Sequence, residues 1–431
     1  MEKAKTFLWL ILLLCSFSVE AVSVINKIKY QGNEVTQSSL LNREIYISPG
    51  DEANEAIIEK SRQAIMDLGL FRSVHYCIEK TSANDLEDNE NYFGDNNESR
   101  VNVVFIVKEK YYLLVIPRFK VEDDIFHYGM QLKWDNIFGL NHESRLLAED
   151  RGSTRGVDEN RFLFKYFYPN FNGTTYNIEI KLQVVNDVDE TDGVIDRQDD
   201  SFQLKVSKWL NERGRNRGWF AGGGVLFKKR FNEDLVDSSN SEKTDAVILG
   251  VDVGYRDIKN FEFNRGGKSY GYKLDWSHAD LGSDDEFTRH LFYYKSYYRF
   301  DSYPLSNLNV QMQIGHSNDD ILGDDAFSLG SSTDLRGYEN SRFNGNTMFL
   351  TNFEFMFPEA EHPVIRYVTF IDIGNTYDVL GDILQEELNV GAGFGLRWKI
   401  RALVNIDLRA DIGYGFTDED YRVSFGTRHA F

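Results

Sequence analysis

The chain has 431 residues, of which 68 are acidic and 48 basic, giving a formal net charge of −20 at pH 7. This charge argues against nucleic acid as a partner, because phosphate backbones are held by clustered lysine and arginine. Glycine (34 residues) and aromatic residues (14%) are frequent and proline is scarce (6 residues), which is typical of long strands joined by turns.

Residues 1–21 are predicted to be a secretory signal peptide. Lys3 and Lys5 precede an apolar run from Phe7 to Phe17 that is too short to cross a bilayer as a helix. Cleavage is expected after Ala21, and the mature chain would then keep Cys77 as its one cysteine. No later apolar run approaches the length of a membrane helix, so a membrane location would require a closed barrel.

Residues 22–110 are predicted to form a small α/β domain. Val24–Tyr30 alternates like a strand, and Glu52–Leu68 has apolar residues at helical spacing. Gly69 is expected to end that helix. A second strand is expected to run through Ile78, and Val101–Lys108 forms a third.

From residue 111 onward the apolar residues recur with a period of two, over segments of about ten residues, which is the pattern of transmembrane barrel strands. Leu388–Ile400 is an example, with apolar residues on one face and glycine or basic residues on the other. A soluble sandwich also has alternating strands, but its strands would be shorter and richer in proline and glycine at their ends. Sixteen strands are predicted, starting near residues 111, 127, 142, 159, 174, 200, 218, 245, 268, 288, 306, 346, 364, 387, 402 and 421.

The connections between these strands alternate in length and charge. If the N-terminal domain is periplasmic, the connections after odd-numbered strands face outward, and these are long and acidic. They are Asp187–Asp200, Phe231–Asp245, Asp280–Glu286, Ser317–Asn346 and Thr417–Asp420. The connections after even-numbered strands are short, and one of them, Arg213–Arg217, is basic.

A group of motifs lies in the last third of the chain. The loop Ser317–Asn346 carries Leu335-Arg336-Gly337-Tyr338. Asp372 stands in Phe370-Ile371-Asp372-Ile373-Gly374, and alternation places Glu354 on an inward strand face. The remaining motif residues are three glycines of one strand and three positions of the last strand: Gly391, Gly393 and Gly395, and Phe425, Gly426 and Phe431.

With these motifs the chain resembles the BamA/TamA-like outer-membrane assembly and secretion superfamily, as a member with a single POTRA module. The resemblance implies that the Leu335–Tyr338 loop folds into the barrel lumen. There Arg336 would bind an inward carboxylate, Asp372 first and Glu354 second, while the glycine strand leaves room for the loop. It also implies that the last strand carries an insertion signal. The chain departs from the family pattern at Lys399–Ala402, where a Pro-x-Gly-Pro turn is usual, and at His429, where an aromatic residue is usual.

The resemblance predicts a location in the bacterial outer membrane, with the POTRA domain in the periplasm. The expected function is insertion or translocation of client polypeptides, without chemical catalysis. A client would add a strand to a POTRA edge, and a seam between Leu113–Val121 and Tyr421–Phe431 would open sideways. Expected partners are outer-membrane lipids and lipopolysaccharide, an unfolded or extended client, and periplasmic accessory proteins.

Three other functions stay open at this point: a channel or secretion pore for one substrate, a structural surface antigen with an inert barrel, and an outer-membrane enzyme. The enzyme is disfavoured because the sequence has no hydrolase, metalloprotease or nucleotide-binding motif. A calcium-loop pattern starting at Asp187 fails, since its twelfth position is Gln198 and not Glu. No metal site and no cofactor are therefore predicted, and no residue is predicted to be catalytic.

Overall fold

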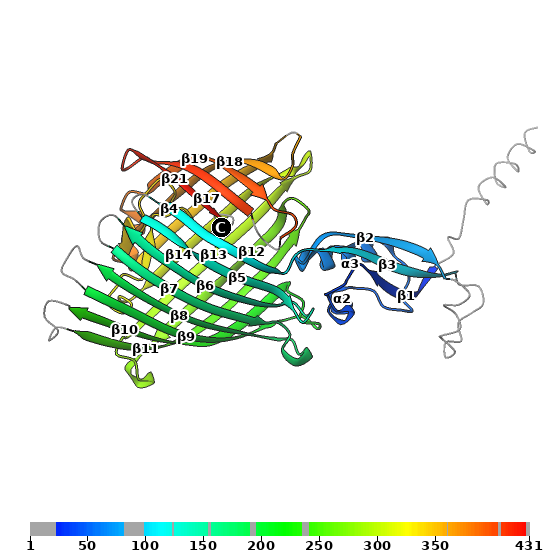
Figure 1. Ribbon diagram of the computed structural model, residues 1–431, viewed down its shortest axis with the longest axis horizontal. Coiled ribbons are helices and arrows are strands. Elements are labelled where there is room, and N and C mark those ends of the chain that lie inside the picture. The colour runs from blue at the N-terminus through cyan, green and yellow to red at the C-terminus, as the bar shows by residue number, and fades with distance from the viewer. Residues whose placement is uncertain are drawn as a thin grey trace, which may run out of the picture.

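The computed structural model describes residues 23–81, 99–122, 125–153, 157–189, 195–234, 241–359, 361–403 and 407–427 (Figure 1). The predicted signal peptide, His429 and Phe431 lie outside these ranges. Within them, no helix is long and apolar enough to cross a membrane.

The N-terminal domain is a three-stranded sheet with two helices. Its elements are β1 (Ser23–Gln31), α2 (Ser38–Glu44), α3 (Glu55–Asp67), β2 (Phe71–Lys80) and β3 (Ser99–Glu109). β3 lies at the centre, parallel to β1 and antiparallel to β2. Leu41, Ile58 and Phe105 pack in its core. This confirms the small α/β domain.

The two helices of this domain differ in how clearly the sequence marks them. Asn54 caps α3 by accepting hydrogen bonds from the amides of Ala56 and Ile57, and Gly69, at φ +75°, lies just beyond the C-terminal end of the helix. α2 was not predicted, because it has seven residues and no side-chain cap, so packing of Leu40 and Leu41 into the core must stabilise it.

Among the described residues after the N-terminal domain, sixteen strands form one antiparallel sheet closed into a barrel, as predicted (Figure 1). Its strands are β4 (Leu113–Glu122), β5 (Ile125–Ile137), β6 (His142–Ser153), β7 (Val157–Tyr168), β8 (Tyr176–Asp189), β9 (Ile195–Trp209), β10 (Gly218–Asp234), β11 (Glu242–Asn260), β12 (Arg265–Ser277), β13 (Phe287–Phe300), β14 (Tyr303–Ser317), β17 (Thr347–Pro358), β18 (Ile365–Tyr377), β19 (Asn389–Lys399), β20 (Asp407–Gly415) and β21 (Asp420–Thr427).

Several strands are longer than the sequence suggested. The predicted loop Asp187–Asp200 is largely strand, because β8 runs to Asp189 and β9 starts at Ile195. The predicted loop Phe231–Asp245 is shortened in the same way by β10 and β11. The acidic residues there favour a loop in the sequence, but the strand pairing continues through them. β20 differs in the other direction, starting at Asp407 and not near residue 402.

The N-terminal domain sits against the short connections of the barrel, as the alternation of loop length predicted. The amide of Gln37 donates to the carbonyl of Gly139 in the β5–β6 turn (3.0 Å). Arg213 and Arg215, in the β9–β10 turn, donate to the carbonyl of Ile45 at 3.0 and 2.7 Å. The long connections therefore lie at the opposite end of the barrel (Figure 1).

The first and last strands of the barrel, β4 and β21, lie at the two ends of the sheet order and next to each other in space. At the end of these strands that faces the N-terminal domain, the amide of Tyr111 donates to the carbonyl of Ala402 (2.9 Å), and Tyr111 forms a parallel bridge with Leu403. The start of the barrel is thus tied to the β19–β20 connection at the end that faces the N-terminal domain.

Candidate functional site

The connection between β14 and β17 folds into the barrel. It contains a short hairpin, β15 (Phe327–Leu329) with β16 (Phe343–Gly345). Leu335 and Tyr338, in the segment between these two strands, pack with Leu329 and with Met348 and Leu350 of β17 in a cluster of buried side chains. The segment that carries Arg336 is therefore held against the inner wall of the barrel.

Arg336 is bound on the inner wall by both predicted carboxylates. Its Nε and Nη2 donate to the two oxygens of Asp372 on β18 at 2.6 and 2.8 Å, and its Nη1 donates to Glu354 on β17 at 2.9 Å. Its backbone amide also donates to Asp372 (3.1 Å), and the guanidinium lies 3.5 Å from the ring centre of Phe370. The exposed fraction of the side chain is 2% for Arg336 and 0% for Asp372.

The ion pairs continue along the inner wall beyond Arg336. Arg397 of β19 donates to the same oxygen of Glu354 (2.8 Å) and to Asp411 of β20 (2.6 Å). Arg409 of β20 lies 3.6 Å from the other oxygen of Asp411 and donates to the carbonyl of Ser332 in the loop. We call these six side chains the lumen network: Arg336, Glu354, Asp372, Arg397, Arg409 and Asp411.

The lumen network has equal numbers of opposite charges, three guanidinium groups and three carboxylates. Buried charges are tolerated in proteins when they are paired and hydrogen-bonded, as here. Asn352 of β17 completes the coordination of Asp372 by donating to it at 2.8 Å. The arrangement is suited to holding a loop in one position against the wall.

Glycines on the facing strands allow this close approach. A side chain at Gly391 of β19 would collide with the carbonyl of Arg336, and one at Gly413 of β20 would lie 2.8 Å from the amide of Gly337. Gly337 itself has φ +99°, which favours glycine. Tyr338 then reaches β19, where its hydroxyl donates to the carbonyl of Val390 (2.7 Å).

The other two predicted glycines make room for different neighbours. A side chain at Gly393 would collide with the ring of Phe370 and the carbonyl of Ile412, and one at Gly395 would collide with Asp411. Gly393 and Gly395 therefore leave space for side chains of the barrel wall, whereas Gly391 contacts the loop directly.

Arg397, Arg409, Asp411 and Gly413 were not singled out as site residues from the sequence. The inward face of an alternating strand was the available signal for all four, since charged residues that face a lumen need partners. What the sequence could not give is which of the inward charges face the same loop.

At the predicted seam, Phe425 of β21 is exposed on the outer face of the barrel, as alternation requires. Gly426 faces the lumen side beside Arg409. The role of Phe425, Gly426 and Phe431 as an insertion signal stays a prediction.

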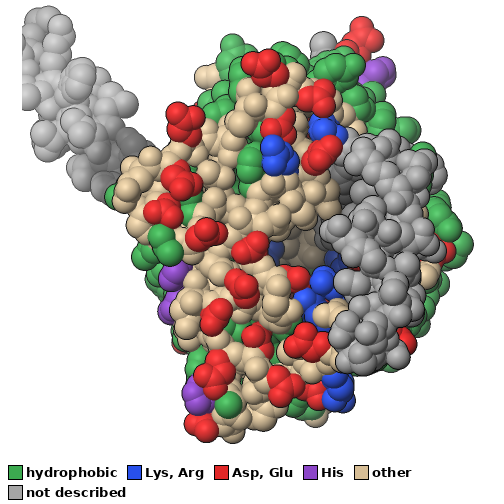
Figure 2. Space-filling model, turned by 90° about the vertical axis from the view of Figure 1, so that its left-hand side faces the viewer, with side chains coloured by type: hydrophobic (Ala, Val, Ile, Leu, Met, Phe, Trp, Pro, Cys, Tyr) green, Lys and Arg blue, Asp and Glu red, His purple; other side chains and the backbone are tan. Residues whose placement is uncertain are grey.

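The face of the barrel opposite the N-terminal domain is acidic. Figure 2 shows Asp and Glu side chains spread over this face and a hollow near its centre, with Lys or Arg side chains visible inside. Among the described residues, no group of three or more His, Cys, Asp or Glu side chains is arranged to hold a metal ion.

Comparison with known families agrees with this geometry. The model of the Omp85 superfamily domain matches residues 91–431, and the POTRA model, described as a surface antigen variable number repeat, matches residues 23–110. The chain belongs to the Omp85 superfamily. Omp85 barrels reside in the bacterial outer membrane with their POTRA domains in the periplasm, which confirms the predicted location. Members of the superfamily are generally non-catalytic transporters or assembly factors.

Solved structures share the fold of this Omp85 protein. BamA from Haemophilus ducreyi lacking POTRA domains 1–3 aligns with a TM-score of 0.53 at 14% identity, covering 94% of this chain and 84% of that one. CdiB from Acinetobacter baumannii and CdiB from Escherichia coli align with TM-scores of 0.59 and 0.60, each at 14% identity over 94% of this chain, and over 73% and 76% of theirs. A comparison with curated proteins found no match.

Proposed function

We propose that this Omp85 protein inserts or translocates client polypeptides at the outer membrane, using a barrel whose inward loop is fixed by Arg336. The observation that supports this most is the binding of Arg336 by Asp372 and Glu354. A loop loses conformational entropy when it is fixed inside a barrel, and these charge-assisted hydrogen bonds offset that loss.

The barrel wall supplies a place where a client strand could enter. β4 and β21 end the sheet order, so their edges are where new strand pairing would cost the fewest existing bonds. The lumen network lies close to this edge, because two of its members, Arg397 and Asp411, are on β19 and β20, the strands that precede β21. In this proposal the lumen network keeps the closing strands in register while a client passes.

The POTRA domain supplies a second edge. Residues 50–53 already occupy the hydrogen-bonding edge of β1. The Ile25 amide donates to the Asp51 carbonyl (2.9 Å), and the Ala53 amide donates to the Ser23 carbonyl (2.8 Å). β2 forms the other edge of the sheet. We therefore assign client binding by strand addition to β2.

A reconstitution experiment tests the main proposal. Wild-type protein in lipid vesicles is expected to accelerate folding of an added, urea-unfolded outer-membrane barrel, measured by its heat-modifiable gel mobility. Arg336→Ala is expected to remove most of this acceleration. Arg342→Ala is the matched control, because Arg342 lies in the same loop but pairs with Asp418 at the exposed mouth (3.1 Å). Equal activity of all three proteins, or none in wild type, would contradict the proposal.

The β2 assignment has its own test. Cys77 lies on β2, so a photo-crosslinker attached to this thiol reports on the edge directly. Crosslinks to an unfolded client that disappear when the client is prefolded support strand addition at β2. A crosslinking yield independent of client folding would contradict it.

A secretion pore is the second candidate, and the hollow at the outer mouth favours it (Figure 2). A lumen cavity of about 760 Å³ also lies at the periplasmic end, lined by POTRA residues such as Tyr46 and by wall residues such as Lys295. In planar bilayers, a pore would conduct in wild type, and its conductance would rise on Arg336→Ala because the loop would leave the lumen. Folding activity without conductance would instead support the insertion function.

A further inference from the structure

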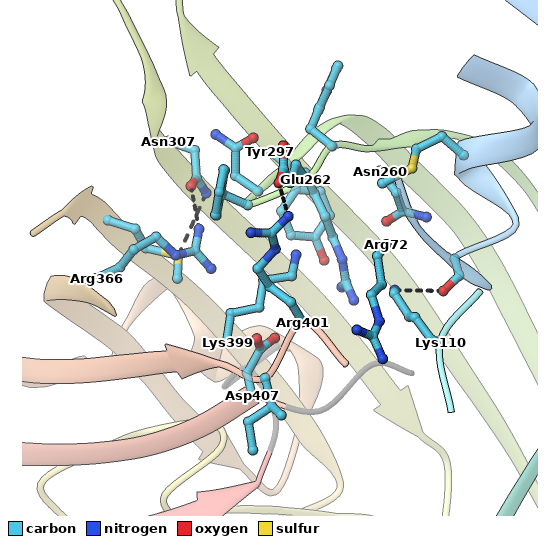
Figure 3. Close-up of a pocket in the computed structure, with 18 of the residues that line it drawn as sticks. Arg72, Lys110, Asn260, Glu262, Tyr297, Asn307, Arg366, Lys399, Arg401 and Asp407 are labelled. Atoms are coloured by element: carbon cyan, nitrogen blue, oxygen red, sulfur yellow. Dashed lines mark hydrogen bonds and ion pairs between the residues drawn. The ribbon is translucent and has the colours of Figure 1, made fainter. Parts of the chain in front are cut away.

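A small cavity lies where the POTRA domain meets the periplasmic end of the barrel (Figure 3). Arg72 and Lys110 reach it from the POTRA side, Arg366 from β18, and Lys399 from the end of β19. Its volume of about 40 Å³ has room for about three water molecules or one small ion. No side chain of the lumen network lines this cavity, although Asn309 of the lining donates to Glu354 (3.4 Å).

The lining of the cavity is strongly cationic. Its acidic residues are Glu262 and Asp407. Its basic residues are Arg72, Lys110, Arg265, Arg366, Lys399 and Arg401. Glu262 is committed to Arg401, with which it forms an ion pair. Six cations therefore share two carboxylates, in contrast to the balanced lumen network.

Arg366 is the most deeply buried of these cations. Its exposed fraction is 2%, and among the described residues it forms no ion pair, although Asp407 and Glu354 act on it electrostatically from beyond ion-pair distance. Its Nη1 donates to Asn307 at 3.3 Å, and its Nε has no hydrogen-bond partner among the described atoms (Figure 3). A buried guanidinium with one weak neutral partner is costly, because the charge has lost water without gaining an anion.

Lys110 and Lys399 add charge at the same place. The Lys110 ammonium donates to the carbonyl of Gly69 at 2.7 Å. The pKa of Lys110 is lowered to about 7, mainly by burial and next by the neighbouring Lys399, whose effect exceeds the opposite effect of Asp407. The structure describes no hydrogen bond or ion pair for the Lys399 ammonium. Lys110 of the POTRA linker thus lines the same cavity as Arg366 and Lys399 of the barrel wall.

We propose that this cavity binds one small oxyanion with phosphate chemistry, held by Arg366, Lys399 and Lys110. A guanidinium offers a planar fork to two oxygens of such an anion, and each ammonium offers a point charge. The volume fits a single tetrahedral group and is too small for a stretch of acidic polypeptide. The phosphate is either a free inorganic ion or the headgroup of a phospholipid.

The bound anion would connect parts of the molecule that otherwise repel one another. Lys110 belongs to the linker between β3 and β4, whereas Arg366 and Lys399 belong to the barrel wall. An anion between them would fix the POTRA linker to β18 and β19. This site is independent of the proposed client function and of its test.

The experiment measures thermal unfolding of the full-length protein in detergent, in chloride and in phosphate at equal ionic strength. Phosphate is expected to raise the Tm of wild type. Arg366→Gln is expected to reduce that increase and to weaken phosphate affinity about tenfold by calorimetry, which corresponds to about 1.4 kcal/mol. Lys399→Gln should behave similarly.

Two comparisons distinguish the loss of a phosphate site from misfolding of the variant. In chloride alone, Arg366→Gln is expected to match or exceed the Tm of wild type, because it removes an uncompensated buried charge. A merely structural Arg366 would lower the Tm in both salts. Arg289→Gln is the matched control, since Arg289 also faces the lumen but has its own carboxylate, Asp275 (2.7 Å); its response to phosphate should equal that of wild type.

Lipid nanodiscs distinguish the two sources of phosphate. If a headgroup occupies the site, discs containing phosphatidylglycerol would abolish the response of wild type to added phosphate, and the lipid would co-purify with wild type more than with Arg366→Gln. If the ion is free, the response would be the same with and without that lipid. The proposal is overturned if phosphate leaves the wild-type Tm unchanged in detergent, or raises the Tm of Arg366→Gln equally.

Discussion

Arg336 shows how one side chain can decide the position of a loop of about thirty residues. All three of its guanidinium nitrogens are bound, two by Asp372 and one by Glu354, at 2.6–2.9 Å. A lysine could not replace Arg336, because its ammonium lacks the planar fork of nitrogens that binds two carboxylates at once. Removing one partner of such a buried pair is much more harmful than replacing the whole pair, because the remaining charge stays buried.

A double-mutant cycle measures this at the residue level. Arg336→Ala and Asp372→Asn are each expected to lower the unfolding free energy of the barrel, with Arg336→Ala costing about 3–5 kcal/mol. The double variant should lose clearly less than the sum of the two single losses. Urea unfolding monitored by tryptophan fluorescence gives the values. Additive losses would show that Arg336 and Asp372 do not act as a pair.

Lys110 leads to a prediction about pH. Its pKa is lowered to about 7 in the folded protein, against 10.5 ordinarily. Below pH 7 the group is charged in both the folded and unfolded states, so the full cost of burying the charge is present. Between pH 7 and 10.5 only the unfolded state keeps the proton, so the cost falls as the pH rises. The charged groups facing Lys110 are Lys133 of β5, Arg265 of β12, Lys399 of β19 and Asp407 of β20.

Lys110→Met is therefore expected to raise the Tm in phosphate-free buffer at pH 6, and to raise it less at pH 10. Lys108→Met is the control, because Lys108 is exposed on β3 and should leave the Tm unchanged at both pH values. A gain for Lys110→Met that grows with pH would show that the ammonium is not penalised by its surroundings.

The sequence alone identified the residues at the centre of the loop but not their whole environment. Arg336 and Asp372 could be named because they stand in motifs that resemble those of the family, and Glu354 because strand alternation turns it inward. The partnership of Arg397 with Glu354 could not, because it depends on the register between β17, β18 and β19. The cavity around Arg366 was also not foreseen, since its lining comes from segments as distant as Arg72 and Asp407.

At the scale of elements, the inner faces of β19 and β20 form the surface that the loop contacts. Glycines on their inner faces let the backbone of Arg336 and Gly337 rest directly on the two strands. The alternation of Leu388–Ile400 was enough to predict this strand and its inward glycines. Short or charged elements are harder to predict from the sequence. The helix α2 depends on tertiary packing, and the acidic ends of β8 and β9 resemble loops in sequence.

Gly391→Ala tests that surface. The new methyl group would collide with the carbonyl of Arg336, which is backbone and cannot move without moving the loop. The expected cost is about 1–3 kcal/mol of unfolding free energy, together with faster proteolysis of the β14–β17 connection. Gly152→Ala on β6 is the control, because a side chain there meets no atom within 4 Å. If both variants resist protease like wild type, the loop does not rest on β19.

At the scale of the whole molecule, the POTRA domain is fastened to the barrel by the β5–β6 turn described above and by two further turns. The β9–β10 turn supplies Arg215, whose guanidinium lies 3.9 Å from the ring centre of Tyr46 and donates to the carbonyl of Ile45. The end of β11 supplies Asn260, whose amide donates to Asp67 at the end of α3 (2.7 Å). The basic turn was visible in the sequence, but its partner surface was not.

Asp67 connects both fastening points, since Arg217 forms an ion pair with it and Asn260 bonds to both its carboxylate and its carbonyl. Asp67→Ala is therefore expected to loosen the POTRA domain without unfolding the barrel. Hydrogen exchange should become at least about tenfold faster in the last turn of α3 and in residues 210–217, which corresponds to about 1.4 kcal/mol of local stability. Glu59→Ala is the matched control on the same helix, because among the described residues Glu59 pairs only with Arg62, on an exposed face. Faster exchange spread evenly over the barrel strands would show a global loss of stability, and unchanged exchange at 210–217 would show that Asp67 does not hold the two parts together.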